Sequence, residues 1–141
     1  MDNPKIPIKL TRPGKLPYII LYHNESKYRF VIDTGSTLSW TTPGVCGSML
    51  MQPESGYDKL IMSNNETVPF IHVTLRIEPR KGTSEDFTAT KFRASFACGE
   101  GSEKIAHMNE VVKYEIHGIL GSDFLLDNML KVDMANMEIA V

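Results

Sequence analysis

Hydrophobic and polar residues alternate along several short stretches of the chain. Between residues 68 and 77 the apolar positions follow a period close to two, and Phe92, Ala94 and Phe96 repeat the same spacing. Successive side chains of a β-strand point to opposite faces of the sheet, so a period of two indicates strands with one face in water. The pattern therefore predicts β-structure over most of the chain.

Turn residues separate these stretches at fairly regular intervals, which is typical of an all-β barrel or sandwich. We expect about eight strands, at residues 6–10, 17–23, 28–33, 38–41, 68–78, 87–96 and, as two short strands, within 131–141. Helix is expected in one or two short pieces. These are an amphipathic stripe from Ile105 to Tyr114 and residues 122–129, where Ser122 offers a cap.

The length and composition favour one globular domain spanning residues 1–141. A chain of 141 residues is about the size of one domain. Hydrophobic residues at 42% and charged residues at 23% are near the globular average. The 15 basic and 17 acidic side chains leave a net charge of -2. This balance offers no basic surplus for a nucleic acid backbone or an anionic membrane, so neither partner is expected.

No segment of the sequence is predicted to cross a membrane. The longest apolar run, residues 18–22, is far shorter than the roughly twenty residues that a spanning helix needs. The first ten residues lack the apolar core of a secretory signal, so the chain as written reads as cytoplasmic. A chain whose signal peptide had been removed would look the same, and a periplasmic or secreted location therefore stays open.

The chain contains two cysteines, Cys46 and Cys98, without the spacing of a metal site or a redox motif. We favour a buried reduced pair over a disulfide, and a disulfide over a chemical role. The four histidines show no spacing typical of zinc ligands either, so no metal is expected.

The most informative stretch is residues 28–40, where an apolar strand ends in Asp33 and continues as Thr34, Gly35 and Ser36. Gly35 permits a tight turn whose backbone N–H groups face the Asp33 carboxylate. An isolated Asp-Thr-Gly would more often be a turn in which the aspartate caps the backbone. A second segment decides between these interpretations: the apolar strand 116–121, which contains Ile119, Leu120 and Gly121 and runs directly into the helix candidate.

Together, Phe-Val-Ile-Asp-Thr-Gly-Ser and Gly-Ile-Leu-Gly-Ser-Asp-Phe-Leu resemble the retropepsin-like aspartic proteases. The resemblance implies a closed acid-protease β-barrel. The last hairpin, within residues 131–140, looks like that of bacterial members. In this family Ile119, Leu120 and Gly121 would form the strand that packs beside the catalytic loop. A flap hairpin would follow that loop, and residues 49–68 are the long candidate for it.

The resemblance implies an endopeptidase in which Asp33 activates water without metal or cofactor. That chemistry needs two carboxylates that share one proton. The sequence holds one Asp-Thr-Gly and no second Asp-Thr-Gly or Asp-Ser-Gly, so the second Asp33 would come from another copy in a homodimer. Thr34 would bond across the interface, Gly35 would fix the loop, and Ser36 would orient the outer oxygen of Asp33. The expected partners are a peptide or protein substrate and a second copy.

A second hypothesis assigns the same fold to a catalytically inactive peptide-binding or interaction module. Such a module would be a monomer, or a dimer in which the two Asp33 side chains never meet. The intact sequence from Asp33 to Ser36 favours the enzyme, because a binding module has little need of that loop. Asp123 begins the helix candidate, where a carboxylate complements the helix dipole, so a structural role is expected for it.

Overall fold

In the computed structural model, eleven strands and three helices make up the described part of the chain, residues 4–23, 26–51, 55–62, 64–77, 90–99, 101–112 and 115–141. The strands are β1 (Lys5–Pro7), β2 (Lys9–Leu10), β3 (Pro17–His23), β4 (Ser26–Ile32), β5 (Ser39–Thr41), β6 (Gly56–Ile61), β7 (Thr67–Ile77), β8 (Lys91–Cys98), β9 (Gly118–Leu120), β10 (Lys131–Asp133) and β11 (Glu138–Ala140). The helices are α1 (Pro43–Leu50), α2 (Gly101–Val111) and α3 (Ser122–Asp127).

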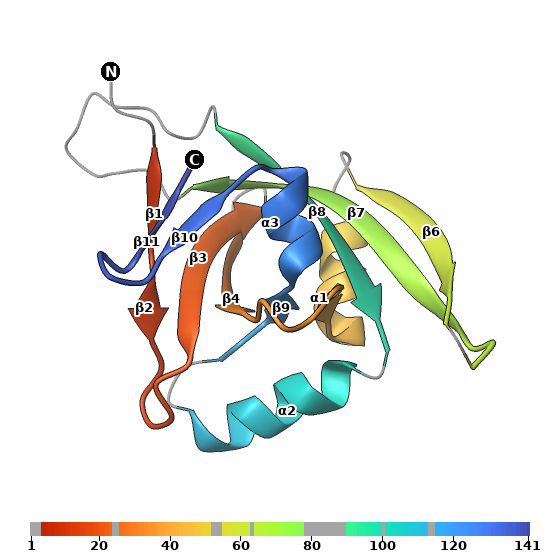
Figure 1. The fold of residues 1–141 in the computed structure, drawn as a ribbon. Helices are drawn as coiled ribbons and strands as arrows, with labels where there is room; N and C mark the ends of the chain where they lie inside the picture. Colours follow the sequence, from red (N-terminus) through yellow and green to blue (C-terminus); the bar gives the residue numbers. More distant parts are fainter. Residues whose placement is uncertain are drawn as a thin grey trace.

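Most strands belong to one sheet with the order β2-β3-β4-β9-β5-β8-β7-β6. An additional pairing of β3 with β7, in which Leu21 lies opposite Ile77, closes six of these strands into a ring. The curved sheet is visible in Figure 1, with α2 lying along one side of it. The predicted all-β fold with a closed barrel is therefore confirmed.

The alternation of side chains along the strands produces two hydrophobic clusters, one on each face of the sheet. On β3, Ile19 and Leu21 point into the larger cluster, whereas Tyr18 and Ile20 point into the smaller one. The smaller cluster includes the fully buried Ile105 of α2. Strand β3 is thus covered on both sides, which explains its continuous apolar run.

The prediction of one or two short helices is corrected by α1. The sequence Pro43-Gly44 looks like a turn, but Pro is also well suited to the first turn of a helix. The Thr42 side chain accepts a hydrogen bond from the Val45 N–H (3.2 Å) and caps the helix. Met49 is fully buried in the larger cluster, so tertiary packing stabilises a helix whose local propensity is weak.

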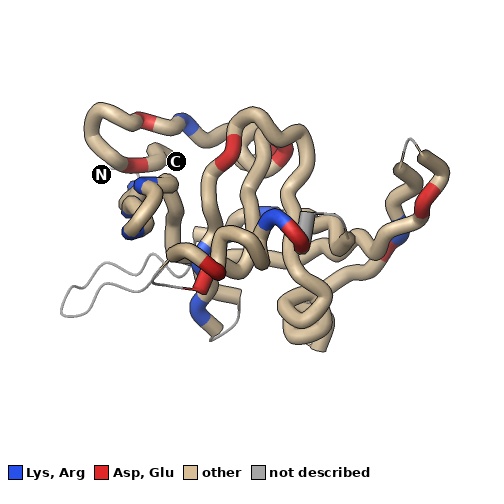
Figure 2. Tube along the Cα trace, turned by 90° about the horizontal axis from the view of Figure 1, so that it is seen from below, with Lys and Arg blue, Asp and Glu red and all other residues tan. Residues whose placement is uncertain are grey.

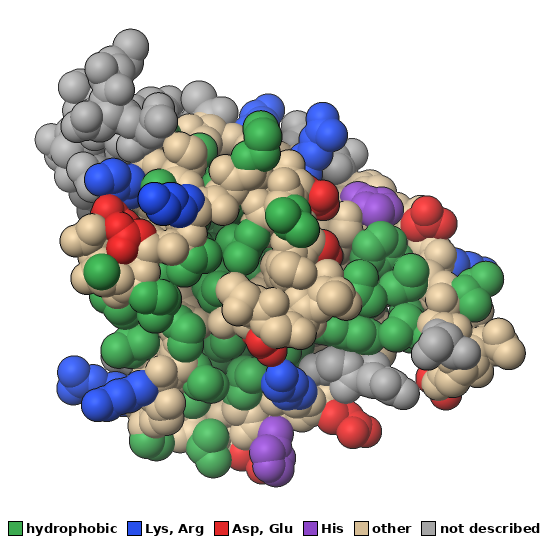
Figure 3. Space-filling model, in the orientation of Figure 1, with side chains coloured by type: hydrophobic (Ala, Val, Ile, Leu, Met, Phe, Trp, Pro, Cys, Tyr) green, Lys and Arg blue, Asp and Glu red, His purple; other side chains and the backbone are tan. Residues whose placement is uncertain are grey.

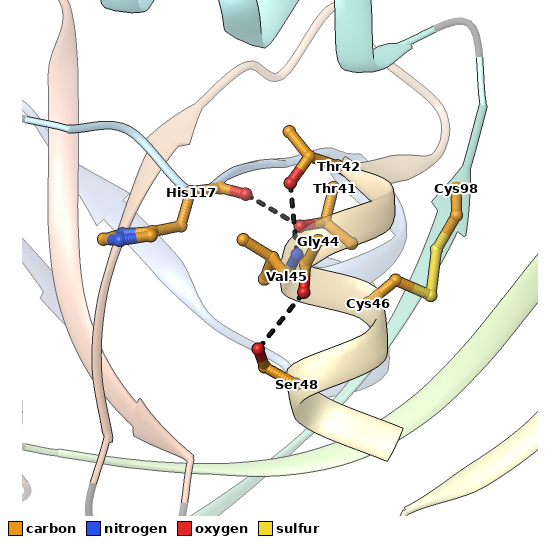
Figure 4. The surroundings of a disulfide bond; sticks show 8 residues. All are labelled: Thr41, Thr42, Gly44, Val45, Cys46, Ser48, Cys98 and His117. Atoms are coloured by element: carbon orange, nitrogen blue, oxygen red, sulfur yellow. Dashed lines mark hydrogen bonds between the residues drawn. A yellow bond between two sulfur atoms is a disulfide. The ribbon is translucent and has the colours of Figure 1, made fainter. Parts of the chain in front are cut away.

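Helix α1 also overturns the expectation of reduced cysteines, because Cys46 and Cys98 form a disulfide (Figure 4). Cys46 lies on α1 and Cys98 on the last position of β8, with the two Cα atoms 6.7 Å apart. Both cysteines are buried in the larger cluster. The prediction was wrong because α1, which brings the two residues together, was not foreseen.

Removing this disulfide is expected to lower the free energy of unfolding by about 3 kcal/mol, because the bond closes a long loop in the unfolded chain. The two cysteines are 52 residues apart in the sequence. The measurement is urea denaturation of the wild type and of the double variant Cys46→Ser, Cys98→Ser, each with and without reductant. Reductant should destabilise the wild type alone; equal stability of the oxidised wild type and the variant would contradict the prediction.

The predicted flap region contains a hairpin, formed by β6 and β7. Its turn is closed by hydrogen bonds from the Met62 N–H to the Glu66 carbonyl (2.8 Å) and from the Asn65 N–H to the Met62 carbonyl (2.9 Å). Asn65 has a φ of 64°, a conformation that asparagine tolerates better than most residues. The hairpin stands away from the barrel in both ribbon and tube views (Figures 1 and 2).

Other element boundaries differ from the predictions by a few residues. β8 begins at Lys91, while the first part of the predicted strand 87–96 lies outside the described residues, as does residue 78 of the predicted strand 68–78. α2 begins at Gly101, earlier than predicted, and residues 113–114 at the end of the predicted stripe also lie outside the described part.

A second, three-stranded sheet joins the first described strand to the last two, in the order β1-β11-β10. Ile6 lies opposite Ile139, and both side chains are buried. The terminal hairpin thus pairs with a strand of its own chain. None of the helices described is long and apolar enough to cross a membrane.

Candidate active site

The pairing of β4 with β9 places Asp33 at the end of a buried strand. The two strands run parallel, with Val31 opposite Ile119 and Ile32 opposite Leu120. The Asp33 N–H extends this ladder by donating to the Leu120 carbonyl (3.0 Å). The backbone of Asp33 is therefore fixed by the sheet, while its side chain stays 31% exposed.

The residues after Asp33 form a tight turn around the carboxylate. The Gly35 N–H donates to Asp33 Oδ1 (3.1 Å), and the Ser36 N–H donates to the Asp33 carbonyl (3.1 Å). The Ser36 hydroxyl donates to the Leu38 carbonyl (2.6 Å), and none of the described hydrogen bonds joins it to the carboxylate. Thr34 is exposed. The roles of Thr34 and Ser36 in a dimer stay predictions.

Gly121 packs beside this turn. An ideal Cβ at position 121 would lie 2.5 Å from the Ser36 carbonyl oxygen and even closer to the Leu38 carbonyl oxygen. The next N–H, that of Ser122, donates to the Ser36 carbonyl (2.8 Å). The structure thus brings the predicted strand residues against the predicted loop, and a glycine is required where the two backbones meet.

Asp123 stabilises the far side of the same loop. Its Oδ1 accepts from the Ser39 hydroxyl (2.7 Å), and its Oδ2 accepts from the Ser39 N–H (3.2 Å). The Ser39 hydroxyl oxygen in turn accepts a hydrogen bond from the Gly121 N–H (2.9 Å). Both oxygens of the Asp123 carboxylate accept hydrogen bonds from Ser39, and these contacts support the structural role expected for Asp123.

The structure adds one residue to the site that the sequence did not indicate. Lys104 Nζ lies 3.1 Å from Asp33 Oδ2, so an ammonium group contacts the oxygen that the turn leaves open. Lys104 is 60% exposed and belongs to α2. In the sequence it looks like an ordinary solvent-facing lysine of an amphipathic helix, 71 residues away from Asp33.

Helix α2 is held firmly against the barrel beside Asp33. Ile105 is fully buried, and the Asn109 side chain makes two hydrogen bonds with the Ile116 backbone (2.8 and 2.6 Å). A groove of about 450 Å³ runs along the helix and is lined by Leu16, Glu103, Lys104, His107, Met108 and Val111. In the orientation of Figure 1, hydrophobic side chains are spread widely over the visible surface (Figure 3).

His117 supports the strand that carries Asp33. Its Nδ1 accepts a hydrogen bond from the Arg29 N–H (3.0 Å), and its ring packs edge-on against Tyr28 at 5.2 Å between centroids. Burial lowers the pKa of His117 below its usual 6.5; Glu115 opposes this shift and Arg29 adds to it. The neutral ring suits the site, because a protonated Nδ1 can no longer accept from Arg29.

We expect the protein to lose stability as the pH falls below about 6.5. The unfolded chain takes up a proton on His117 at its ordinary pKa, whereas the folded chain takes it up only at lower pH. Urea denaturation of the wild type and of His117→Asn at pH 7.5 and 5.5 will check this. Asparagine keeps an acceptor without titrating, so the variant should lose less stability on acidification; an equal loss would contradict this role for His117.

Among the described residues, no group of three His, Cys, Asp or Glu side chains is placed to hold a metal ion. Asp33 and Lys104 are the ionisable groups in contact at this site. A carboxylate held at a strand end and open to solvent is suited to accept a proton from water.

The comparisons with known proteins support the fold. No protein-family model and no curated protein matches this chain. Among solved structures, a retropepsin-like aspartic protease from Rickettsia conorii matches with a TM-score of 0.52 and 18% sequence identity, covering 99% of this chain and 90% of that one. The predicted retropepsin-like fold is thereby confirmed; at this identity the likeness concerns the fold alone.

Proposed function

We propose that this retropepsin-like chain is an aspartic endopeptidase that hydrolyses peptide bonds as a homodimer. The observation that carries the proposal is the Asp33 carboxylate, which is held at a fixed strand end and remains partly exposed. The loop is anchored along one segment: the Leu120 carbonyl accepts from the Asp33 N–H, and the Ser122 N–H donates to the Ser36 carbonyl. Such anchoring holds a reacting carboxylate in place. The protease found among solved structures has the same fold.

The reaction requires one Asp33 from each copy. Two carboxylates that share one proton divide the work between them. The ionised carboxylate takes a proton from water as the water oxygen attacks the peptide carbonyl carbon, and the protonated one donates to the carbonyl oxygen. Collapse of the tetrahedral intermediate breaks the C–N bond, and the nitrogen leaves with a proton from the dyad. No covalent bond to the protein forms.

The exposed apolar side chains support the homodimer. Among the described residues, Leu126 is 75% exposed, Met129 89% and Val111 62%. Figure 3 shows many hydrophobic side chains on one face of the molecule. Large exposed apolar patches are typical of interaction sites rather than of free surfaces. A dimer formed through this face would cover part of the patch and leave the rest for an extended peptide.

Cleavage of a peptide library, read by mass spectrometry between acidic and neutral pH, tests the proposal. We expect cleavage that a chelator leaves unchanged, and sedimentation should show a dimer at the concentrations where cleavage occurs. The rate per chain should fall on dilution below the dissociation constant of the dimer. A protein that stays monomeric with peptide present and cleaves nothing would overturn the proposal.

One observation favours the alternative, a peptide-binding module without catalysis. In the single chain, Lys104 Nζ forms an ion pair with Asp33 Oδ2, so the carboxylate has a charged partner without a second copy. Binding of library peptides by a strict monomer, without cleavage, would establish this second function.

A further inference from the structure

Lys104 brings a positive charge to the reacting carboxylate, and this charge has a consequence for the substrate. We propose that Lys104 selects peptides with an acidic side chain close to the bond that is cleaved. The inference rests on the proposed function, because it names the substrate class of the same site. Its starting point is the contact of 3.1 Å between Lys104 Nζ and Asp33 Oδ2.

In the part of the chain that the structure describes, Asp33 is the carboxylate in contact with Lys104, and neighbouring acids are unsuited to replace it. Asp123 is engaged by the Ser39 side chain and backbone. Glu110 lies 3.6 Å from His107. Glu103 lines the same groove, but it is adjacent to Lys104 in the sequence, and adjacent residues on a helix do not face each other. When Asp33 pairs with the second Asp33 of the dimer for catalysis, Lys104 therefore loses the carboxylate that it contacts in the single chain.

The charges of the Asp33 and Lys104 side chains do not balance without a further carboxylate. The two Asp33 side chains share a proton in the working dyad and so carry one negative charge. The two Lys104 side chains carry two positive charges. A peptide that fills the site excludes water, and a cation without a partner is then costly. An acidic side chain of the peptide supplies the missing charge and accepts a charge-assisted hydrogen bond from Lys104.

The position of Lys104 restricts where that acidic side chain lies. Helix α2 is anchored by Ile105 and Asn109, so the ammonium moves only within the reach of its own side chain. Glu103 and Lys104 line the groove, as does Val111, which lies seven residues further along the helix than Lys104. This is about 10 Å, the length of roughly three extended peptide residues. A peptide laid along α2 thus meets Lys104 beside Asp33, and His107, Met108 and Val111 beyond it.

The first test compares the cleavage profiles of the wild type, Lys104→Gln and Lys104→Glu on the same peptide library. We expect the wild type to favour Asp or Glu at one position near the cleaved bond by about tenfold over Gln. The preference should disappear in Lys104→Gln and reverse toward Lys or Arg in Lys104→Glu. Lys9→Glu, an exposed charge reversal on β2, is the matched control and should keep the wild-type profile.

A binding test separates this inference from the proposed function. In the Asp33→Asn background, with and without Lys104→Gln, fluorescence anisotropy measures binding of labelled heptapeptides of alanine and leucine in which Glu, Gln or Lys is scanned through each position. We expect tighter binding of Glu peptides, lost with Lys104→Gln and weakened by salt. Equal binding of Glu and Gln peptides would overturn the role of Lys104. Absence of cleavage by the wild type, with the Glu preference intact, would overturn the protease alone.

Discussion

Replacement of Asp33 by asparagine is expected to lower kcat/KM for peptide cleavage by at least about 10²–10⁴-fold, the usual contribution of a general acid or base. Asparagine keeps the size of the side chain and an oxygen that can accept from the Gly35 N–H. It cannot take a proton from water. The loss should therefore appear in kcat, measured with a peptide that the wild type cleaves.

The fold should survive this substitution, which makes the loss of activity interpretable. The ion pair with Lys104 is solvent-exposed, and such pairs contribute only about 0–1 kcal/mol. Excess Asp33→Asn protein mixed with wild type should also suppress cleavage, because mixed dimers hold a single functional carboxylate. Unchanged cleavage by the variant, or insensitivity of the wild type to the added variant, would contradict the shared dyad.

Replacement of Gly121 by alanine is expected to lower the free energy of unfolding by about 4 kcal/mol or more, at the upper end of single-residue effects. The added Cβ would meet the backbone carbonyl oxygens of Ser36 and Leu38, and backbone atoms cannot move aside as a side chain can. The loop that follows Asp33 would have to leave its contact with Ser122. Urea denaturation measures the stability, and peptide cleavage at low temperature measures the effect on the loop.

Gly47→Ala is the matched control, since an ideal Cβ at position 47 meets nothing within 4 Å. Gly47 lies within α1, where alanine favours helix over glycine by roughly 0.5–1 kcal/mol. The control should therefore be neutral or slightly stabilising. A Gly121→Ala variant as stable as this control would show that the loop and β9 separate without loss.

The sequence was sufficient for the parts of the fold that depend on local signals. The alternation of side chains located most barrel strands. The local signal alone did not assign Asp33 to a site, because an isolated Asp-Thr-Gly is more often a turn. The contact of the strand containing Ile119 with that turn followed from the family resemblance rather than from the local pattern. The structure confirms the fold and shows this contact directly.

Helix α1 and the disulfide could not be predicted for a common physical reason. Residues 43–50 contain a proline and two glycines, so local propensity favours a turn. The helix is stable because Met49 is buried and Cys46 is tied to β8. Both contacts involve residues far away in the sequence. A pattern of neighbouring residues carries no information about them.

Lys104 shows the same limit at the site. A lysine on the outer face of an amphipathic helix is the ordinary arrangement for solvent exposure. Lys104 belongs to the candidate site because it contacts Asp33. That contact exists only because α2 packs on the β9 side of the barrel through Ile105 and Asn109. The charge is visible in the sequence, but its neighbour is not.

The order β1-β11-β10 of the terminal sheet also bears on how the protein is made. β11 is synthesised after every other strand described here, yet it is the central strand with which both β1 and β10 pair. During synthesis β1 cannot pair with β11 until more than a hundred further residues have been added, and until then Ile6 lacks its partner Ile139. This sheet therefore forms after translation of the barrel strands, and a chain stalled before β11 would expose apolar residues that cellular quality control can detect.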